Sequence, residues 1–347
     1  MRIAMLGAGA VGYANSAYLL DRGHEVTLWS PSGRSTAALR DAAIICEGEV
    51  EGVFRPEIAT TCAEAVENAD IVMVALPANG HRMVYEAMVP ALSDGQVVVI
   101  SAQPVLAGYR LRAAITERGL DVPVVVWGTT LLRSRRHEGT RVRINTIRRS
   151  LDAAVWPAGN SAAENLCAEV FGDRFRMRDD MMAVSLANIN PQCHLALALT
   201  NITRMERAEV WGQSENLTAS VARLLADLDA ERLAIGSALG IEVRSLAEHY
   251  SRTYELPESS LEQMAEAIRA LGPGQLGPTT ADSRYVLEDA PFGLVALVAL
   301  GRATGREAVL HEAGLRLLSS LYRREFTTEN DVLEGLDIQS LVDEARF

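Results

Sequence analysis

A glycine-rich loop near the N-terminus is the first part of the sequence whose residue types and spacing specify a ligand. Residues 7–12 read Gly-Ala-Gly-Ala-Val-Gly and lie between an expected strand at 2–6 and an expected helix at 11–22. The first glycine permits a tight turn, the second lets the backbone approach a pyrophosphate, and the third lets helix pack on strand. The free N–H groups of a helix N-terminus favour that negative charge. The loop predicts a dinucleotide cofactor held by Gly7, Ala8, Gly9, Ala10, Val11 and Gly12.

The residues after the second expected strand, at 25–29, favour a phosphorylated cofactor. An acidic residue at this point would bind the 2′-hydroxyl of an unphosphorylated ribose. Here the chain continues Ser-Pro-Ser-Gly-Arg-Ser over 30–35 and offers no acid. Hydroxyls and an arginine suit a 2′-phosphate, so Ser30 and Arg34 predict a preference for NADP(H). In the alternative, Arg34 stacks on adenine or faces solvent, and NAD(H) is the cofactor.

Two later expected strands end in loops that belong on the nicotinamide and substrate side, because dinucleotide sites lie at the carboxyl ends of parallel strands. The strand at 71–76 ends with Leu76 and Pro77, which we expect to border the ribose or nicotinamide. His81 follows and either contacts cofactor or substrate or caps the next helix. The strand at 122–127 leads to Thr130, a candidate substrate contact. The arginines that come next are typical of a solvated face; they are Arg133, Arg135 and Arg136.

A histidine and a carboxylate in the second half of the chain are candidates for proton transfer. His194 lies at the start of an expected helix, in Asn-Ile-Asn-Pro-Gln-Cys-His, and Asp289 lies far downstream in Arg-Tyr-Val-Leu-Glu-Asp-Ala-Pro. A histidine titrating near neutral pH and oriented by a carboxylate can move a proton while a hydride is delivered. On spacing alone a structural role for His194 is favoured, because a lone histidine is more often a structural one.

The elements that must position these residues change character near residue 180. Strand and helix alternate before it, which predicts an α/β fold with an N-terminal Rossmann doubly wound sheet over residues 1–180. Residues 181–347 are expected to form a C-terminal all-helical domain. Its expected helices lie at 191–208, 218–239, 260–270, 293–303 and 310–322, with a loop at 271–280. Ser259 and Glu262 match a capping box.

The first domain has further expected elements. Residues 141–147 and 153–156 suggest an antiparallel addition to this domain, which a helix at 161–171 and a strand at 175–177 complete. A short helix is expected at 35–43.

Composition excludes several classes of protein. The chain has 347 residues, 48% of them hydrophobic and 22% charged, which predicts about two globular domains. A net charge of −12 argues against a nucleic-acid partner. No apolar run reaches the ~20 residues that span a bilayer. The four cysteines show no metal or CxxC spacing, so we expect no metal site and a reducing, cytoplasmic location. All 33 basic residues are arginine, which excludes catalysis by a lysine amine.

Several of these motifs together resemble the opine dehydrogenases, the octopine and nopaline dehydrogenase family. The resemblance rests on the glycine loop, Val-Ala-Leu-Pro at 74–77, Asn-x-Asn-Pro-x-x-His, Leu-Asp-Ala-Glu-Arg-Leu-Ala at 228–234, and Arg-Tyr-x-x-Glu-Asp-x-Pro. It implies that His194 is the catalytic histidine and Asp289 its carboxylate partner. It further implies that Arg284 binds a substrate carboxylate, that Asn190 positions substrate, and that the protein forms a homodimer.

The function implied by this resemblance is an NAD(P)H-dependent condensation of an amino acid with a 2-oxo acid, followed by reduction of the imine to a secondary amine dicarboxylate. Ketopantoate, hydroxyacid and glycerol-phosphate dehydrogenases share the two-domain plan but use a lysine, which this chain lacks. Two alternatives stay open. One is a 2-oxo acid or imine reductase that needs no amine, and the other is a dinucleotide-binding sensor without catalysis.

Overall fold

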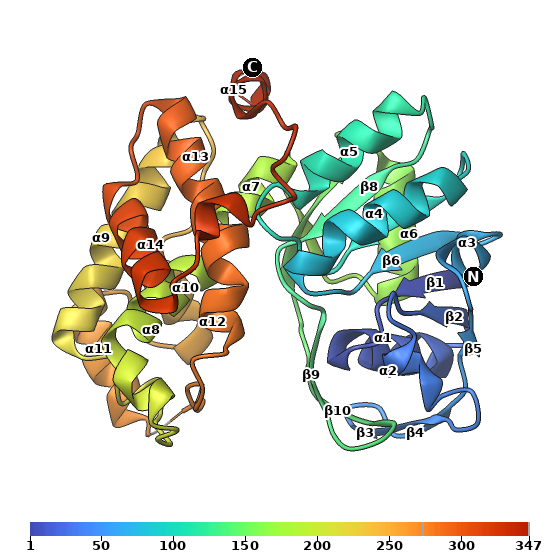
Figure 1. Cartoon of the computed structure of the whole chain (residues 1–347), viewed down its shortest axis with the longest axis horizontal. Coiled ribbons are helices and arrows are strands. Elements are labelled where there is room, and N and C mark those ends of the chain that lie inside the picture. Colours follow the sequence, from blue (N-terminus) through green and yellow to red (C-terminus); the bar gives the residue numbers. More distant parts are fainter. Residues whose placement is uncertain (273, 346–347) are drawn as a thin grey trace. The chain divides into compact units, whose positions relative to one another are not determined.

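The computed structural model describes residues 1–272 and 274–345 and contains two compact units (Figure 1). The first unit runs from Met1 to Ser185 and the second begins at Leu186. This division lies a few residues beyond 180 because helix α7 (Met181–Leu186) is bonded to the first unit. Gln103 donates both to the carbonyl of Met181 and to the hydroxyl of Ser185, at 3.3 Å in each case.

The first unit is built on an eight-stranded sheet of order β12-β11-β8-β7-β6-β1-β2-β5. Its neighbours pair in parallel except for β11 with β8, which are antiparallel. The strands are β1 (Arg2–Leu6), β2 (Glu25–Trp29), β5 (Glu57–Ile58), β6 (Ile71–Val74), β7 (Val97–Ile100), β8 (Val124–Trp127), β11 (Leu151–Trp156) and β12 (Phe175–Met177). With a helical second unit, this confirms the predicted fold class.

The central strands are buried on both faces, as their continuous apolar sequences require. Every residue of β6, β7 and β8 is buried. The helices of the unit are α1 (Ala10–Asp21), α2 (Arg34–Ala37), α3 (Cys62–Val66), α4 (His81–Met88), α5 (Ala107–Glu117) and α6 (Ser161–Phe171). Trp127 at the end of β8 packs edge-on against Phe171 of α6, with ring centroids 4.9 Å apart. The helix expected at 35–43 is shortened to α2, because the chain turns there into another strand.

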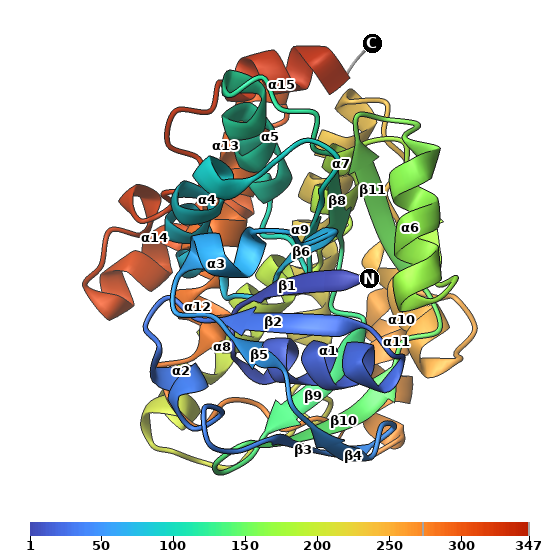
Figure 2. The ribbon, with the colours of Figure 1, turned by 90° about the vertical axis from the view of Figure 1, so that its right-hand side faces the viewer.

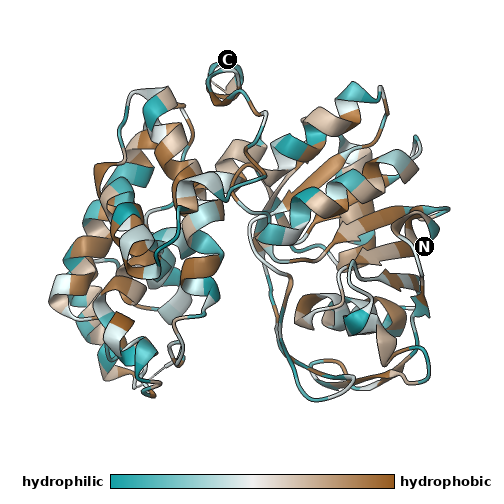
Figure 3. Cartoon of the chain, in the orientation of Figure 1, coloured by the Kyte–Doolittle hydropathy of each residue, from teal (hydrophilic) through white to brown (hydrophobic). Residues whose placement is uncertain are grey.

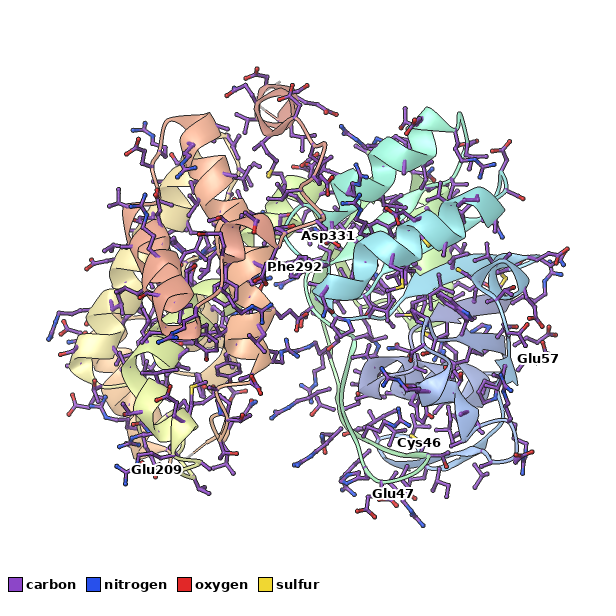
Figure 4. The ribbon with its side chains drawn as sticks, viewed as in Figure 1. Cys46, Glu47, Glu57, Glu209, Phe292 and Asp331 are labelled. Carbon is purple, nitrogen blue, oxygen red and sulfur yellow. The ribbon has the colours of Figure 1, made fainter. Side chains whose placement is uncertain are left out.

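A second, four-stranded sheet of order β4-β3-β10-β9 lies against α1 (Figure 2). It consists of β3 (Ile44–Gly48), β4 (Gly52–Phe54), β9 (Leu132–Arg136) and β10 (Arg141–Ile147). The antiparallel addition expected at 141–147 and 153–156 was therefore wrong as a single feature. The first segment, β10, pairs antiparallel with β9, whereas the second, β11, joins the main sheet. Glu47 of β3, labelled in Figure 4, forms ion pairs with Arg141 and Arg143 of the neighbouring β10.

The regular elements of the second unit, among its described residues, are helices, and these carry both hydrophobic and hydrophilic residues (Figure 3). Its main elements are α8 (Asn190–Glu206), α9 (Ala219–Ala238), α10 (Leu246–Tyr254), α11 (Leu261–Ala270), α12 (Arg284–Leu287), a π-turn η3 (Ala290–Leu294), α13 (Val295–Thr304), α14 (Val309–Tyr322) and α15 (Ile338–Ala345). Their core contains Leu228, Leu315 and Phe326. No described helix combines the length and apolarity needed to cross a membrane.

Capping explains where two of these helices begin. The capping box of α11 is formed by Ser260 and Gln263, so the prediction of Ser259 and Glu262 was one residue too early. Both pairs match the sequence pattern, and the burial of Leu261 as the first helical residue selects the later one. A second capping box, Ser245 with Glu248, begins α10, a helix that the periodicity did not reveal.

Candidate active site

The glycine loop joins β1 to α1 in a geometry that only glycine permits at two positions. Gly7 has a φ of +122°, and a Cβ there would lie 2.3 Å from the carbonyl oxygen of Ala75. A Cβ on Gly12 would lie 1.8 Å from the carbonyl oxygen of Gly7. A Cβ on Gly9, in contrast, would meet no atom within 4 Å. The backbone at the start of α1 is therefore open to an approaching anion, which suits a cofactor pyrophosphate.

The small sheet braces this loop from outside. Arg136 Nη1 donates to the carbonyl of Ala8 at 2.9 Å, and Ser134 Oγ donates to that of Ala10 at 3.1 Å. The Arg136 guanidinium also lies over the Tyr13 ring, 4.1 Å from its centroid. The arginine run after β8 is therefore not wholly a solvated face. Arg133 and Arg135 are exposed, whereas Arg136 is half-buried against the loop.

The other predicted cofactor residues lie at the ends of neighbouring strands. β1 pairs with β6 so that Leu6 lies opposite Val74, and the chain continues into Leu76, half-buried, and Pro77, exposed. Gly7 donates to the carbonyl of Trp29 at the end of β2 at 2.9 Å. The sheet thus places Leu76, Pro77, Ser30 and the glycine loop at one edge. Ser30 is buried, while Arg34 is exposed at the start of α2.

His81 does not present its ring to a ligand, so the expected substrate contact is contradicted. It is fully buried, its Nε2 donates to the carbonyl of Leu76 at 3.2 Å, and its Nδ1 accepts from the Tyr85 hydroxyl at 2.9 Å. Burial lowers the pKa of His81 to about 4, which keeps the ring neutral in this arrangement. The ring fastens the turn between β6 and α4. The alternative prediction, a side-chain cap on α4, also fails because no capping bond forms.

Thr130 is half-buried in the loop that follows β8. Its carbonyl accepts a hydrogen bond from Arg148 Nε at 2.9 Å. Thr130 lies four residues after Val126 in the central sheet, and its contact with substrate stays a prediction.

The helical unit brings His194 and Asp289 together, although 95 positions separate them. His194 lies in the second turn of α8, and Asp289 precedes the π-turn η3. Nδ1 of His194 is 2.6 Å from Oδ2 of Asp289, and each side chain is 12% exposed. The Tyr285 ring stacks on the imidazole with centroids 3.6 Å apart and planes 12° from parallel. Asp289 fixes one ring nitrogen while the pair keeps access to solvent.

Arg284 and Asn190 are close to this pair in the sequence, and both are more exposed to solvent than His194 and Asp289. Arg284 begins α12, five residues before Asp289, with its side chain 65% exposed and its Nε 3.7 Å from Glu288. Asn190 is exposed at the start of α8, where its N–H donates to Oδ1 of Asn188 at 3.0 Å. Both are accessible to a ligand, and their roles toward substrate stay predictions.

A second histidine–carboxylate pair, which the sequence reasoning missed, lies in the same unit. Nδ1 of His311 is 2.7 Å from Oε2 of Glu231, and Glu231 also accepts from the N–H groups of Leu310 and His311 at 2.7 and 3.2 Å. Burial favours the neutral acid, but these hydrogen bonds outweigh it and lower the pKa of Glu231. One signal was present, since Glu231 belongs to the Leu-Asp-Ala-Glu-Arg-Leu-Ala segment.

A parallel sheet with an open glycine loop, followed by a helical unit holding a carboxylate-paired histidine, is the arrangement of NAD(P)-dependent dehydrogenases. The family model "NAD/NADP octopine/nopaline dehydrogenase, alpha-helical domain" matches residues 177–322, and the ketopantoate reductase PanE/ApbA model matches residues 3–157. An opine dehydrogenase of Arthrobacter sp. (strain 1C) is 30% identical, covering 97% of this chain and 95% of its own length. The chain therefore belongs to the opine dehydrogenase family, as the resemblance predicted, and is an NAD(P)-dependent oxidoreductase acting on CH–NH bonds.

Solved structures share the whole fold at low sequence identity. Octopine dehydrogenase in complex with NADH and agmatine superposes with a TM-score of 0.79 at 16% identity, covering all of this chain and 96% of that one. Yersinopine dehydrogenase with NADP⁺ bound gives a TM-score of 0.72 at 17% identity, covering 99% and 97%. At these identities the likeness supports the fold, and the two cofactors differ between the two proteins.

Proposed function

We propose that this chain condenses an amino acid with a 2-oxo acid and reduces the resulting imine with NAD(P)H, using His194 as the proton donor. The observation that carries the proposal is the 2.6 Å contact between His194 and Asp289 in the helical unit. General acid–base chemistry at a reducible C=N bond needs one oriented, accessible group that can give and take a proton. The chain has no lysine to serve instead.

The pair can perform this proton transfer through one atom. Asp289 accepts from Nδ1–H, so Nε2 is the nitrogen that exchanges a proton with substrate, and the carboxylate stabilises the imidazolium. Tyr285, stacked on the ring, holds its plane. Amine and 2-oxo acid first lose water to form the imine. A nicotinamide cofactor, when bound, would supply the hydride that reduces this C=N bond. His194 Nε2–H gives its proton to the nitrogen.

Arg284 is the residue we assign to a substrate carboxylate. Its guanidinium is exposed, lies on the short helix that leads to Asp289, and can form two parallel hydrogen bonds with a carboxylate. Asn190, at the exposed start of α8, is assigned to the same substrate. Replacing Arg284 with Met should raise KM for the 2-oxo acid or amino acid about tenfold or more. A rise confined to the cofactor KM would instead assign Arg284 to the dinucleotide.

We further propose that the cofactor is NADP(H) in preference to NAD(H). The glycine loop would hold the pyrophosphate, and Ser30 with the exposed Arg34 would hold the 2′-phosphate, since the segment after β2 offers no acid. Fluorescence titration should give a lower Kd for NADPH than for NADH, and Arg34→Ala should weaken NADPH about tenfold while leaving NADH within twofold. Equal affinities for the two cofactors would contradict the preference.

The activity itself is tested by NAD(P)H oxidation with paired amino acids and 2-oxo acids, followed by mass analysis of the product. Oxidation should require both partners and yield a mass equal to their sum less one oxygen atom. Oxidation with oxo acid alone would identify a reductase that needs no amine. Tight cofactor binding without turnover over a broad panel would identify a sensor.

We also infer a homodimer in the cytoplasm. Exposed apolar side chains on α14, among them Leu317 and Leu321, offer a surface for self-association, and the four cysteines are free thiols, as expected in a reducing compartment. Sedimentation analysis should give twice the chain mass. Substituting Leu317 and Leu321 with Glu should then yield monomers.

A further inference from the structure

The segment Leu-Asp-Ala-Glu-Arg-Leu-Ala at 228–234 places an ion pair inside α9. Arg232 is fully buried and Asp229 nearly so, three residues apart on one face of the helix. Nε and Nη2 of Arg232 donate to Oδ1 of Asp229 at 3.1 and 2.6 Å. Removing two charges from water is costly, and such a pair contributes little net stability. Its place in the core points to another role.

The remaining bonds of the pair reach three separate segments. Arg232 Nη1 donates to the carbonyl of Leu186, the first residue of the helical unit, at 2.6 Å. Nη2 donates to the carbonyl of Arg244 at 2.8 Å, and Oδ2 of Asp229 accepts from the N–H of Leu246, which begins α10, at 2.7 Å. The pair therefore fixes the point where the chain enters this unit.

The third segment is the first turn of α8. Gln192, fully buried and two residues before His194, donates from Nε2 to Oδ1 of Asp229 at 2.7 Å. Its own amide oxygen has no partner among the described residues, so Asp229 alone orients the amide. The opposite orientation would bring two oxygen atoms together. The N-cap residue of α8, Ile189, makes no side-chain cap, and in the described part of this helix start only the N–H of Asn190 is bonded by a preceding side chain, that of Asn188.

Close packing against two glycines also holds the start of α8. A Cβ on Gly293 would lie 2.4 Å from Pro191, and a Cβ on Gly314 would lie 2.6 Å from Leu195. The start of α8, which leads directly into the turn of His194, is thus seated against two glycine backbones and bonded to Asp229. A displacement of the turn would lengthen the 2.6 Å contact between His194 and Asp289.

We propose that Asp229 and Arg232 are positioning residues that act through Gln192 to hold the His194 imidazole against Asp289. This inference rests on the proposed function of His194. The pair touches no part of the catalytic dyad itself, and its effect on turnover passes through the first turn of α8. Misplacing a catalytic group by about 1 Å can slow a reaction up to 10²-fold.

The test is Gln192→Met, which cuts the link and leaves the buried ion pair intact. Truncating Asp229 would leave the buried Arg232 charge without its carboxylate partner and risk unfolding the protein. In Gln192→Met we expect kcat to fall about tenfold while the Kd for NADPH, measured by fluorescence, changes less than twofold. A downfield proton resonance of the Nδ1–H between His194 and Asp289, assigned by its absence in His194→Ala, should move or broaden. Arg232→Lys keeps the positive charge but lacks the planar guanidinium that binds Asp229 through two nitrogens. It should change kcat and the resonance in the same direction.

Gln96→Met is the matched control. Gln96 is a buried glutamine of the first unit that donates to the carbonyls of Val66 and Ala69 at 2.9 and 2.8 Å. It should lower Tm without changing kcat or the resonance. If Gln192→Met likewise lowers only Tm, the positioning role is refuted. If His194→Ala keeps full turnover while the resonance still moves in Gln192→Met, the proposed function fails and the positioning of His194 stands.

Discussion

Two histidine–carboxylate pairs of nearly equal geometry lie in the described part of the helical unit, and their surroundings differ. His194 Nδ1 is 2.6 Å from Asp289, and His311 Nδ1 is 2.7 Å from Glu231. The His194 side chain is 12% exposed, whereas that of His311 is wholly buried and its Nε2 has no hydrogen-bond partner among the described residues. A carboxylate orients both rings, and only the access of the second nitrogen suits one of them to proton exchange.

The two carboxylates also differ in the groups that they bind. Glu231 accepts from two backbone N–H groups at the start of α14 as well as from His311. It therefore satisfies N–H groups of the first turn that have no acceptor within the helix. Asp289 lies at the beginning of a π-turn, a form often found at functional sites. The pair at His311 therefore joins two helices, and the pair at His194 is available for chemistry.

The largest difference should appear when the two rings are removed. His194→Ala should lower kcat about 10²- to 10⁴-fold, the usual contribution of general acid–base catalysis. The Tm should stay close to that of the wild type because the ring is partly exposed. Steady-state kinetics and thermal unfolding measure both, and near-normal turnover would eliminate His194 as the proton donor.

The next effect concerns the partner of the catalytic ring. In Asp289→Asn the amide NH₂ can donate to Nδ1, which favours the wrong tautomer and removes the charge that steadies the imidazolium. We expect kcat to fall about 10²- to 10⁴-fold with the Kd for NADPH unchanged. A loss of less than threefold would show that Asp289 does not orient the ring for catalysis.

The buried ring should show the reverse pattern. His311→Leu removes a buried donor and leaves Glu231 with its backbone donors, which should lower the free energy of unfolding by about 1–3 kcal/mol. Urea denaturation measures this loss. The kcat per folded molecule should stay within twofold of the wild type, and a loss comparable to that of His194→Ala would overturn the distinction between the pairs.

The smallest effect is a pH dependence of stability at Glu231. Its pKa in the folded protein lies below the ordinary value of about 4.3. The stabilisation it provides is therefore complete above that ordinary value and is lost as pH falls through the lowered one. Urea midpoints between about pH 5 and 3 should fall more steeply for the wild type than for Glu231→Gln. Parallel curves would show that Glu231 contributes no such linkage.

Sequence patterns predicted the parts of the molecule that depend on local rules. Continuous apolar runs gave β6 and β8, and the glycine spacing gave the loop whose Gly7 and Gly12 have no room for a side chain. The contact of His194 with Asp289 was predicted from the motifs that contain them, because no local rule links residues so far apart.

The errors came from contacts that local sequence does not encode. His81 follows a strand at the cofactor edge, yet its ring turns inward because the Tyr85 hydroxyl and the Leu76 carbonyl occupy both nitrogens. The sequence predicts Arg136 to be one of three solvated arginines, but in the folded chain it contacts the Tyr13 ring and the Ala8 carbonyl. In each case a partner from another element decides where the side chain lies.

The brace on the glycine loop has a consequence for synthesis of the chain. Ser134 and Arg136 reach back to the carbonyls of Ala10 and Ala8, so the strand that supports the loop leaves the ribosome long after the loop itself. A nascent chain that ends before β9 has the nucleotide-binding glycines but not the hairpin that seats them. The contacts that support the glycine loop can therefore form only late in synthesis, when most of the first unit has been translated.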